Sequence, residues 1–170
     1  VVMRGINDSE IADFARLTLE HSLAMRFIEY MPIGTHEQWG RHRVMPSAEV
    51  RARIEEIHGP LERLEEDSAT AGPARYWRIP GAPGKLGFIS AVTEEFCAGC
   101  NRMRLTSDGK LRGCLISNGE VDLRSAFRAG ASDDDIRELV LEAVRNKPEQ
   151  HHINDGQYQA PSYSMMQLGG

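Results

Sequence analysis

Residues 96–115, FCAGCNRMRLTSDGKLRGCL, decide the interpretation of this chain. They hold all three cysteines of the 170-residue sequence, Cys97, Cys100 and Cys114, within eighteen positions. Three soft thiolates are one ligand short of the closed tetrahedral set of a structural zinc site. They suit an iron-sulfur cluster in which one iron stays open to another ligand. The spacing therefore predicts a metal centre with three protein ligands.

Two other arrangements of the cysteines remain open at this point. A structural zinc site could take a remote histidine, such as His151 or His152, as its fourth ligand, and ligand softness alone does not decide between the metals. A disulfide between Cys97 and Cys100 is the other arrangement. Clustered thiols in an intracellular protein more often bind metal or do redox chemistry, and three cysteines cannot all pair.

The residues between the second and third cysteines predict a tight hairpin. Arg104 to Thr106 and Lys110 to Leu115 have the character of strands, and Ser107-Asp108-Gly109 is a turn sequence. Such a hairpin folds Cys114 back toward the other two cysteines, so all three thiols are expected to share one centre.

Positive charge is concentrated in the same segment. Arg102, Arg104, Lys110 and Arg112 stand there against a single acid, Asp108, although the whole chain has a formal net charge of −5. Arginine is well shaped to hold phosphate or carboxylate through paired hydrogen bonds. The pattern predicts an anionic substrate beside the metal centre.

The chain on either side alternates helical and strand patterns. A βαβ pattern opens the sequence, whereas the part around the cysteines has hairpin strands followed by helices. The expected helices and strands are a helix over 8–21 with a capping box at Asn7 and Glu10, a buried strand over 24–30, a loop over 31–45, a helix from Ser47 stopped by Gly59-Pro60, strands over 75–79 and 86–92, a helix over 121–129, and a helix capped by Ser132 that ends before Pro148.

Composition places the chain among globular proteins. It is 41% hydrophobic, and no apolar stretch approaches the ~20 residues needed to span a bilayer. No basic segment followed by an apolar segment resembles a secretory signal. We therefore expect a cytoplasmic protein with no membrane partner and no nucleic-acid polymer as partner.

Three stretches resemble the MoaA-type GTP 3′,8-cyclases, which are radical S-adenosylmethionine (SAM) enzymes of molybdenum cofactor biosynthesis. They are the cysteine motif at 96–115, RFIEYMP at 26–32, and the ending SMMQLGG at 164–170. The resemblance implies an α/β fold: the C-terminal part of an incomplete radical SAM (β/α) barrel, plus a small α+β subdomain carrying an auxiliary iron-sulfur cluster. The chain would then divide into the last βα units of the barrel (1–60), a linker (61–84) indicated by its acidic and then Gly- and Pro-rich composition, a cluster-binding subdomain (85–150) and a tail ending in Gly-Gly (151–170).

The resemblance also implies an activity and its cofactors. The complete enzyme would convert GTP to (8S)-3′,8-cyclo-7,8-dihydroguanosine 5′-triphosphate for molybdopterin, using SAM and a 4Fe-4S cluster with one open iron. Its partners would be GTP and the next enzyme of the pathway, and a homodimer is expected. The implied site residues are Cys97, Cys100 and Cys114 for the metal, Arg102, Met103 and Arg104 for the substrate, Met31 for SAM, and Arg26, Gly169 and Gly170 for catalysis.

Arg26 and the terminal glycines are also singled out by their own chemistry. Arg26 stands in an apolar strand, where a buried arginine needs a partner such as Glu29. Gly169-Gly170 could enter a narrow site closed to any residue with a Cβ.

The family's N-terminal CxxxCxxC motif, which binds the SAM-cleaving cluster, has no counterpart in this sequence. We therefore expect this chain to be a C-terminal piece that is inactive alone. Another radical SAM enzyme with an auxiliary cluster, or a non-catalytic zinc-binding module, are the other interpretations. The DGKLRGCL hairpin and the terminal Gly-Gly argue against the first, and the incomplete ligand set with its adjacent arginines argues against the second.

Overall fold

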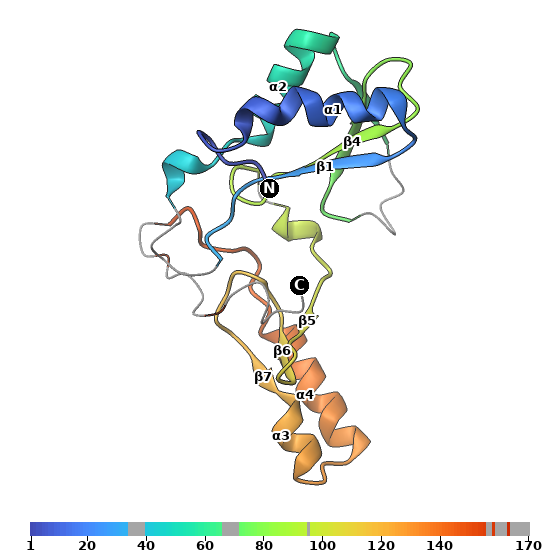
Figure 1. The fold of residues 1–170 in the computed structure, drawn as a ribbon. Helices are drawn as coiled ribbons and strands as arrows, with labels where there is room; N and C mark the ends of the chain where they lie inside the picture. Colours follow the sequence, from blue (N-terminus) through green and yellow to red (C-terminus); the bar gives the residue numbers. More distant parts are fainter. Residues whose placement is uncertain (34–39, 66–71, 95, 156–157, 159–162, 164–170) are drawn as a thin grey trace. The chain divides into compact units, whose positions relative to one another are not determined.

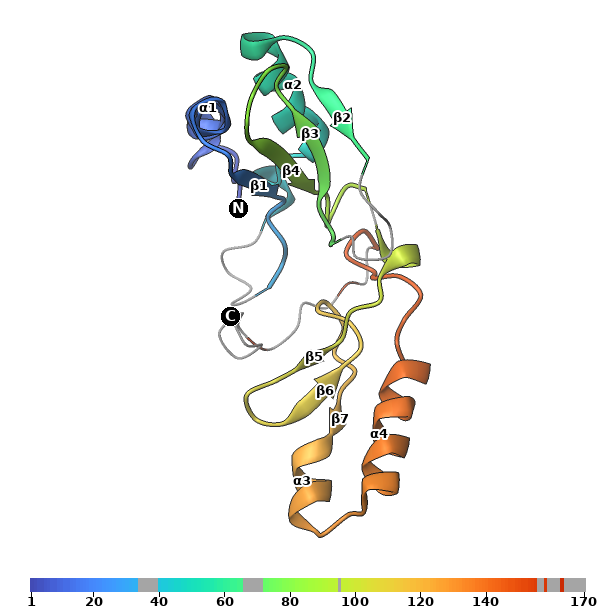
Figure 2. The same ribbon diagram turned by 90° about the vertical axis from the view of Figure 1, so that its right-hand side faces the viewer.

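The computed structural model describes residues 1–33, 40–65, 72–94, 96–155, 158 and 163. It is a mixed α/β structure in which the chain contacts separate two compact units, each described below by itself (Figures 1 and 2). Unit 1 comprises residues 1–31 and 40–96, and unit 2 comprises residues 32–39 and 97–170. No helix within the described ranges is long and apolar enough to cross a membrane.

Unit 1 is built on a four-stranded sheet of order β1-β4-β3-β2. The outer strand β1 runs parallel to β4, and the other neighbours are antiparallel. The elements of this unit are the 3-10 turn Asp8–Glu10, α1 (Ile11–Glu20), β1 (Ala24–Ile28), the 3-10 turn Arg41–Arg43, α2 (Ser47–His58), β2 (Glu62–Leu64), β3 (Arg75–Arg78) and β4 (Lys85–Ile89).

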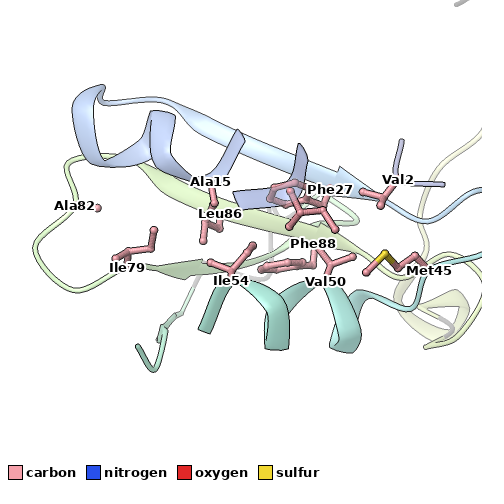
Figure 3. Close-up of a cluster of buried hydrophobic side chains, with 11 residues drawn as sticks. Val2, Ala15, Phe27, Met45, Val50, Ile54, Ile79, Ala82, Leu86 and Phe88 are labelled. Carbon is pink, nitrogen blue, oxygen red and sulfur yellow. The ribbon is translucent and has the colours of Figure 1, made fainter. Parts of the chain in front are cut away.

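One face of this sheet and both helices enclose the core (Figure 3). Phe88 of β4 lies at its centre, stacked on Phe27 with ring centroids 5.8 Å apart and meeting the edge of Trp77 at 5.2 Å. Ile54 of α2 and Leu86 of β4 are fully buried. Burying an aliphatic side chain of this size stabilises a fold by about 1.5–3 kcal/mol, so this cluster is the main source of stability in unit 1.

The buried carboxylate of Glu29 joins three parts of unit 1. It follows β1, is 2% exposed, and accepts hydrogen bonds from the backbone N–H groups of Ser47 (2.8 Å), Val92 (2.8 Å) and Thr93 (2.9 Å). A carboxylate that accepts several backbone N–H bonds can be buried because its charge is satisfied. Glu29 thus fixes the start of α2 and the loop after β4 against the end of β1.

Unit 2 contains a three-stranded antiparallel sheet of order β5-β6-β7 and two helices. Its elements are the 3-10 turn Cys97–Gly99, β5 (Arg104–Leu105), β6 (Lys110–Arg112), β7 (Val121–Asp122), α3 (Leu123–Arg128) and α4 (Asp133–Arg145). In Figure 2, α4 runs beside β7 and α3, which agrees with its contacts to both.

Two sequence predictions about helix starts have different outcomes. The cap at Ser132 is confirmed, because its side chain accepts from the Asp135 N–H while Asp135 accepts from the Ser132 N–H, a complete capping box. The capping box at Asn7 was wrong. The Asn7 Oδ1 accepts instead from the Met3 N–H at 2.8 Å, which closes the preceding turn.

Two strands of the unit 1 sheet fall between the predicted boundaries at 60 and 84, and the predicted domain division stays a prediction. Residues 61–84, expected as a linker, supply strands β2 and β3, and β4 pairs with β1 in unit 1. The Pro- and Gly-rich run at 80–84 makes a turn between β3 and β4. Gly84 lies so close to α1 and β1 that an added Cβ would stand 2.6 Å from the His21 carbonyl oxygen. Glycine here serves close packing within a sheet.

Candidate metal and substrate site

The three cysteines lie in unit 2 on two chain segments that meet at a hairpin. Cys97 opens a 3-10 turn, and the Cys100 N–H donates to its carbonyl at 2.9 Å. The predicted hairpin is confirmed, with Arg104 opposite Arg112 and Leu105 opposite Leu111. Strand β6 ends at Arg112, so Cys114 lies in the segment that follows it.

Gly109 explains the tightness of this hairpin. Its φ of +81° is a conformation that side chains with a Cβ rarely adopt. An added Cβ would also stand 2.6 Å from the Cβ of Arg124. The Gly109 carbonyl accepts from the N–H groups of Leu123 (3.1 Å) and Arg124 (3.0 Å), so the turn that reverses the chain also anchors the start of α3.

Two of the thiols receive hydrogen bonds suited to thiolates. The Ile116 N–H donates to the Cys114 sulfur at 3.4 Å. At Cys100 burial acts to raise the pKa of the thiol, but the Arg102 backbone N–H and the positive charges of Lys147 and Arg102 outweigh it, so this pKa is lowered. The thiolate is the reactive and metal-binding form of cysteine, and a lowered pKa increases its fraction at neutral pH.

The ammonium of Lys147 connects the two segments that carry the cysteines. Its Nζ donates to the Cys100 sulfur at 3.6 Å and to the carbonyls of Arg102 at 2.8 Å and Gly113 at 2.6 Å. Arg102 precedes the hairpin and Gly113 follows it, so one side chain spans both segments where the strand pairing has ended. Nothing in the sequence pattern singled out this lysine.

The described residues contain no group of three His, Cys, Asp or Glu side chains placed to hold a metal ion together. All three cysteines are half-buried, and the disulfide between Cys97 and Cys100 is not formed. His152 pairs with Asp155 at 2.6 Å, and His151 is buried. Convergence of the three sulfurs on one metal stays a prediction.

The four cations of the cysteine segment fall into two pairs. Lys110 and Arg112 both form ion pairs with Glu120, at 3.1 Å in the case of Arg112. The hydrogen bond and the charge of Glu120 raise the pKa of Lys110. Arg102 is exposed and Arg104 is half-buried. Lys110 and Arg112 thus share an acidic partner, and anion binding by Arg102 and Arg104 stays a prediction.

The buried side chain of Arg112 supports the loop that follows Cys114. Its side chain is 3% exposed, its Nη2 donates to the Ser117 carbonyl at 2.8 Å, and its guanidinium stands 3.6 Å from the Tyr163 ring centroid. The Tyr163 hydroxyl, with its one hydrogen, lies within donating distance of two carbonyls, those of Leu115 (3.1 Å) and Ser117 (2.9 Å). These contacts fix the backbone just beyond Cys114.

A cavity of about 190 Å³ lies against this same loop. It is lined by residues 116–118, Pro148, residues 150–152 and Tyr158. The buried Tyr158 hydroxyl has no hydrogen-bond partner among the residues that the structure describes. Burial raises the pKa of Tyr158, and the proximity of Tyr163 and Cys114 adds to the effect. Sequence analysis gave no signal for this cavity, because residues 148–158 carry no periodic pattern.

Arg26 lies in unit 1 and is exposed, so its predicted burial was wrong. The period-2 alternation of β1 places Phe27 in the core and Arg26 on the opposite face. There Arg26 stands opposite Gly87 and donates from Nε to the Tyr76 hydroxyl at 2.7 Å. An added Cβ at Gly87 would be 2.9 Å from the Tyr76 ring, so glycine lets the ring lie across β4. Glu29 accepts from backbone amides as described above.

The remaining predicted site residues divide by how far the structure describes them. Met31 is half-buried and follows β1 in unit 1. Met103 is half-buried and immediately precedes β5 in unit 2. Gly169 and Gly170 lie outside the described residues. The predicted roles of all four stay predictions.

Comparison with known proteins identifies the family. Residues 23–153 match the family described as Molybdenum Cofactor Synthesis C. A GTP 3′,8-cyclase of Moorella thermoacetica is 46% identical over 170 residues, covering 100% of this chain and 51% of that protein. Proteins of the same name from Heliobacterium modesticaldum and Syntrophomonas wolfei are 45% and 44% identical over 170 residues, each covering 100% of this chain and 52% of the relative.

These matches agree with the resemblance seen in the cysteine motif. The chain spans about half the length of the curated relatives it matches. The matched region includes both the sheet of unit 1 from β1 onward and the cysteine segments of unit 2. The chain therefore belongs to the Molybdenum Cofactor Synthesis C family.

Proposed function

We propose that this chain is the C-terminal part of a radical SAM GTP 3′,8-cyclase. In this proposal Cys97, Cys100 and Cys114 hold a second 4Fe-4S cluster, and Arg102, Met103 and Arg104 contact GTP. Arg26 and Met31 would act at the SAM side of the site, and the Gly169-Gly170 tail would support cyclisation. The fold would complete a radical SAM barrel in the cytoplasm, and the product would pass to the next enzyme of molybdopterin synthesis.

The observation that carries the proposal is the identity of 39–46% to proteins named GTP 3′,8-cyclase, seven of the eight aligning with the whole chain. The chemistry of unit 2 supports it. Three thiols are present, and two of them accept hydrogen bonds from the backbone N–H groups of Arg102 and Ile116. Hydrogen bonds to sulfur are among the features that set the properties of iron-sulfur clusters.

The donor set fits a cluster with one open iron better than it fits zinc. Three thiolates leave one of four irons without a protein ligand, and when bound the cluster would offer that position to the guanine of GTP. The protein's share is binding and orientation. Arg104 begins β5 and is held by the hairpin, while the backbone carbonyl of Arg102 is fixed by Lys147. Both guanidiniums would therefore be presented from an ordered backbone to an anionic substrate.

The test compares the intact protein with a variant in which Cys97, Cys100 and Cys114 are all serine. After anaerobic purification the wild type should contain about four more iron atoms per chain than the variant, with the broad visible absorption of an iron-sulfur cluster. GTP binding, followed calorimetrically, should weaken in the variant. Equal iron in the two proteins, or zinc in place of iron, would overturn the proposal. This chain alone, which has no CxxxCxxC motif, is expected not to produce 5′-deoxyadenosine from SAM.

A further inference from the structure

We propose that Lys147 is a positioning residue for the metal centre: its ammonium ties together the two segments that carry the cysteines and donates a hydrogen bond to the Cys100 sulfur. The inference rests on the proposed function, in that these cysteines hold a cluster. It adds a residue outside the cysteine motif, 33 positions after Cys114.

The first argument is the count of hydrogen bonds at Nζ. An ammonium has three N–H donors and no acceptor. At Lys147 all three have partners: the Cys100 sulfur and the carbonyls of Arg102 and Gly113. A surface lysine at a helix end gains little stabilising free energy from holding its flexible side chain in one geometry. All three donors are used, and their acceptors lie on two separate segments. This arrangement indicates that the contact is a specific feature of the fold.

The backbone at Gly113 passes close to the backbone of Lys147. Lys147 follows the last turn of α4, and its N–H donates to the Val144 carbonyl at 3.2 Å. The Gly113 backbone passes so close that an added Cβ would stand 3.1 Å from both the Cα and the Cβ of Lys147, and 3.2 Å from the Ala143 carbonyl oxygen. The absence of a side chain at Gly113 lets the segment that leads to Cys114 reach the end of α4.

The third argument concerns charge. Thiolates gathered at one centre repel one another, and a cation between their segments offsets that repulsion. Lys110 and Arg112, the cations nearest in sequence to Cys114, are already paired with Glu120. The Lys147 ammonium, in contrast, donates a hydrogen bond to the Cys100 sulfur. Hydrogen bonds and charge at the sulfurs raise the reduction potential of a cluster, so this lysine would tune the centre as well as hold its ligands.

The experiment uses the intact protein and the substitution Lys147→Met, which keeps the alkyl stem and removes the donors and the charge. The matched control is Arg145→Met, a cation two positions earlier whose side chain is 63% exposed and paired with Glu138. The triple cysteine-to-serine variant defines the iron that belongs to this site. The measurements are the rate of iron loss to a chelator and the midpoint potential from anaerobic redox titration.

We expect Lys147→Met to lose this iron about 10–100-fold faster than wild type, the usual cost of removing a partner of a metal ligand. Its midpoint potential should become more negative, a shift that a purely structural role would not produce. Arg145→Met should match wild type in both. Chelation rates within about twofold of wild type, with an unchanged potential, would overturn the inference.

A second measurement keeps the test decisive should Lys147→Met fold poorly. In the loaded wild-type protein, an amine-acylating reagent should modify Lys147 at least about tenfold more slowly than in the urea-unfolded protein, because all three donors are engaged. Equal rates would refute the contact. If the triple serine variant keeps all its iron, the proposed function fails, whereas loss of iron in that variant but not in Lys147→Met refutes the role of the lysine alone.

Discussion

Replacing Arg112 by Met tests whether a buried guanidinium fixes the loop after Cys114. The wild-type side chain is 3% exposed and makes three contacts that methionine cannot make. They are an ion pair with Glu120, a hydrogen bond to the Ser117 carbonyl, and stacking on the Tyr163 ring. Methionine keeps much of the apolar stem, so the substitution removes the charge and the donors with little loss of packing.

The expected cost follows from these contacts. The Glu120 carboxylate is 31% exposed, so its ion pair contributes about 1 kcal/mol or less. The charge-assisted bond to Ser117 contributes roughly 1.5–3 kcal/mol, and a desolvated cation–π contact contributes about 2 kcal/mol. Removing a buried charge also relieves its desolvation, which offsets part of the loss. We therefore expect a net destabilisation of about 2–4 kcal/mol, localised in unit 2.

Amide hydrogen exchange read by mass spectrometry is the suitable assay, because two compact units make a single global unfolding transition doubtful. Exchange in peptides spanning residues 112–118 should speed up about 30- to 700-fold in Arg112→Met, the equivalent of the expected free-energy change. Arg145→Met, which removes an exposed cation from the same unit, should change it less than about threefold. An Arg112→Met protein that exchanges like wild type in this region would refute the argument that Arg112 anchors the loop.

Three further predictions concern other parts of the chain. Replacing Arg102 or Arg104 by Ala should weaken GTP binding by about tenfold or more at unchanged iron content, and Lys should not fully restore it, since an ammonium lacks the planar fork; normal binding in both Ala variants would move the substrate site elsewhere. Ile54→Ala should cost about 2–5 kcal/mol in urea unfolding of unit 1, against less than about 0.5 kcal/mol for Ile57→Ala, which is 62% exposed. Hydrogen bonds from the hydroxyl and the N–H of Ser132 lower the pKa of Asp135. The stability that this carboxylate adds is therefore present above its unfolded pKa of about 4 and disappears as the pH falls through the lower folded pKa. Asp135→Asn should remove this acid-dependent step from circular dichroism titrations.

The features that the sequence predicted well are those determined by neighbouring residues. The hairpin over residues 104–112 follows from a turn that needs glycine at φ +81°, and the cap of α4 follows from the serine at its start. Helix α2 ends at His58, just before the predicted stop at Gly59, whose φ is +79°. Each of these signals lies within a few residues of the structure it specifies, so no tertiary information was required.

The features that the sequence did not predict depend on contacts between distant segments. Burial of Arg26 was inferred from its apolar neighbours, yet a strand covered by helices on one face places alternate residues on the other. The turn at 80–84 between two strands was predicted, but the pairing of β2 with β3 and of β4 with the distant β1 was not. Glu29 and Lys147 reach partners 18 to 64 and 34 to 47 positions away, and no periodic pattern marks such contacts.

The sorting of cations around the cysteines changes how the site is understood. From sequence, four basic residues between Cys100 and Cys114 formed one anion-binding patch. In the structure Lys110 and Arg112 share the Glu120 carboxylate as their ion-pair partner, which makes them parts of the scaffold. A cation from another element, Lys147, reaches the Cys100 sulfur instead. Positive charge at the Cys100 sulfur comes from both Lys147 and Arg102, so replacing Arg104 tests the proposed substrate contact without changing the charge at that thiol.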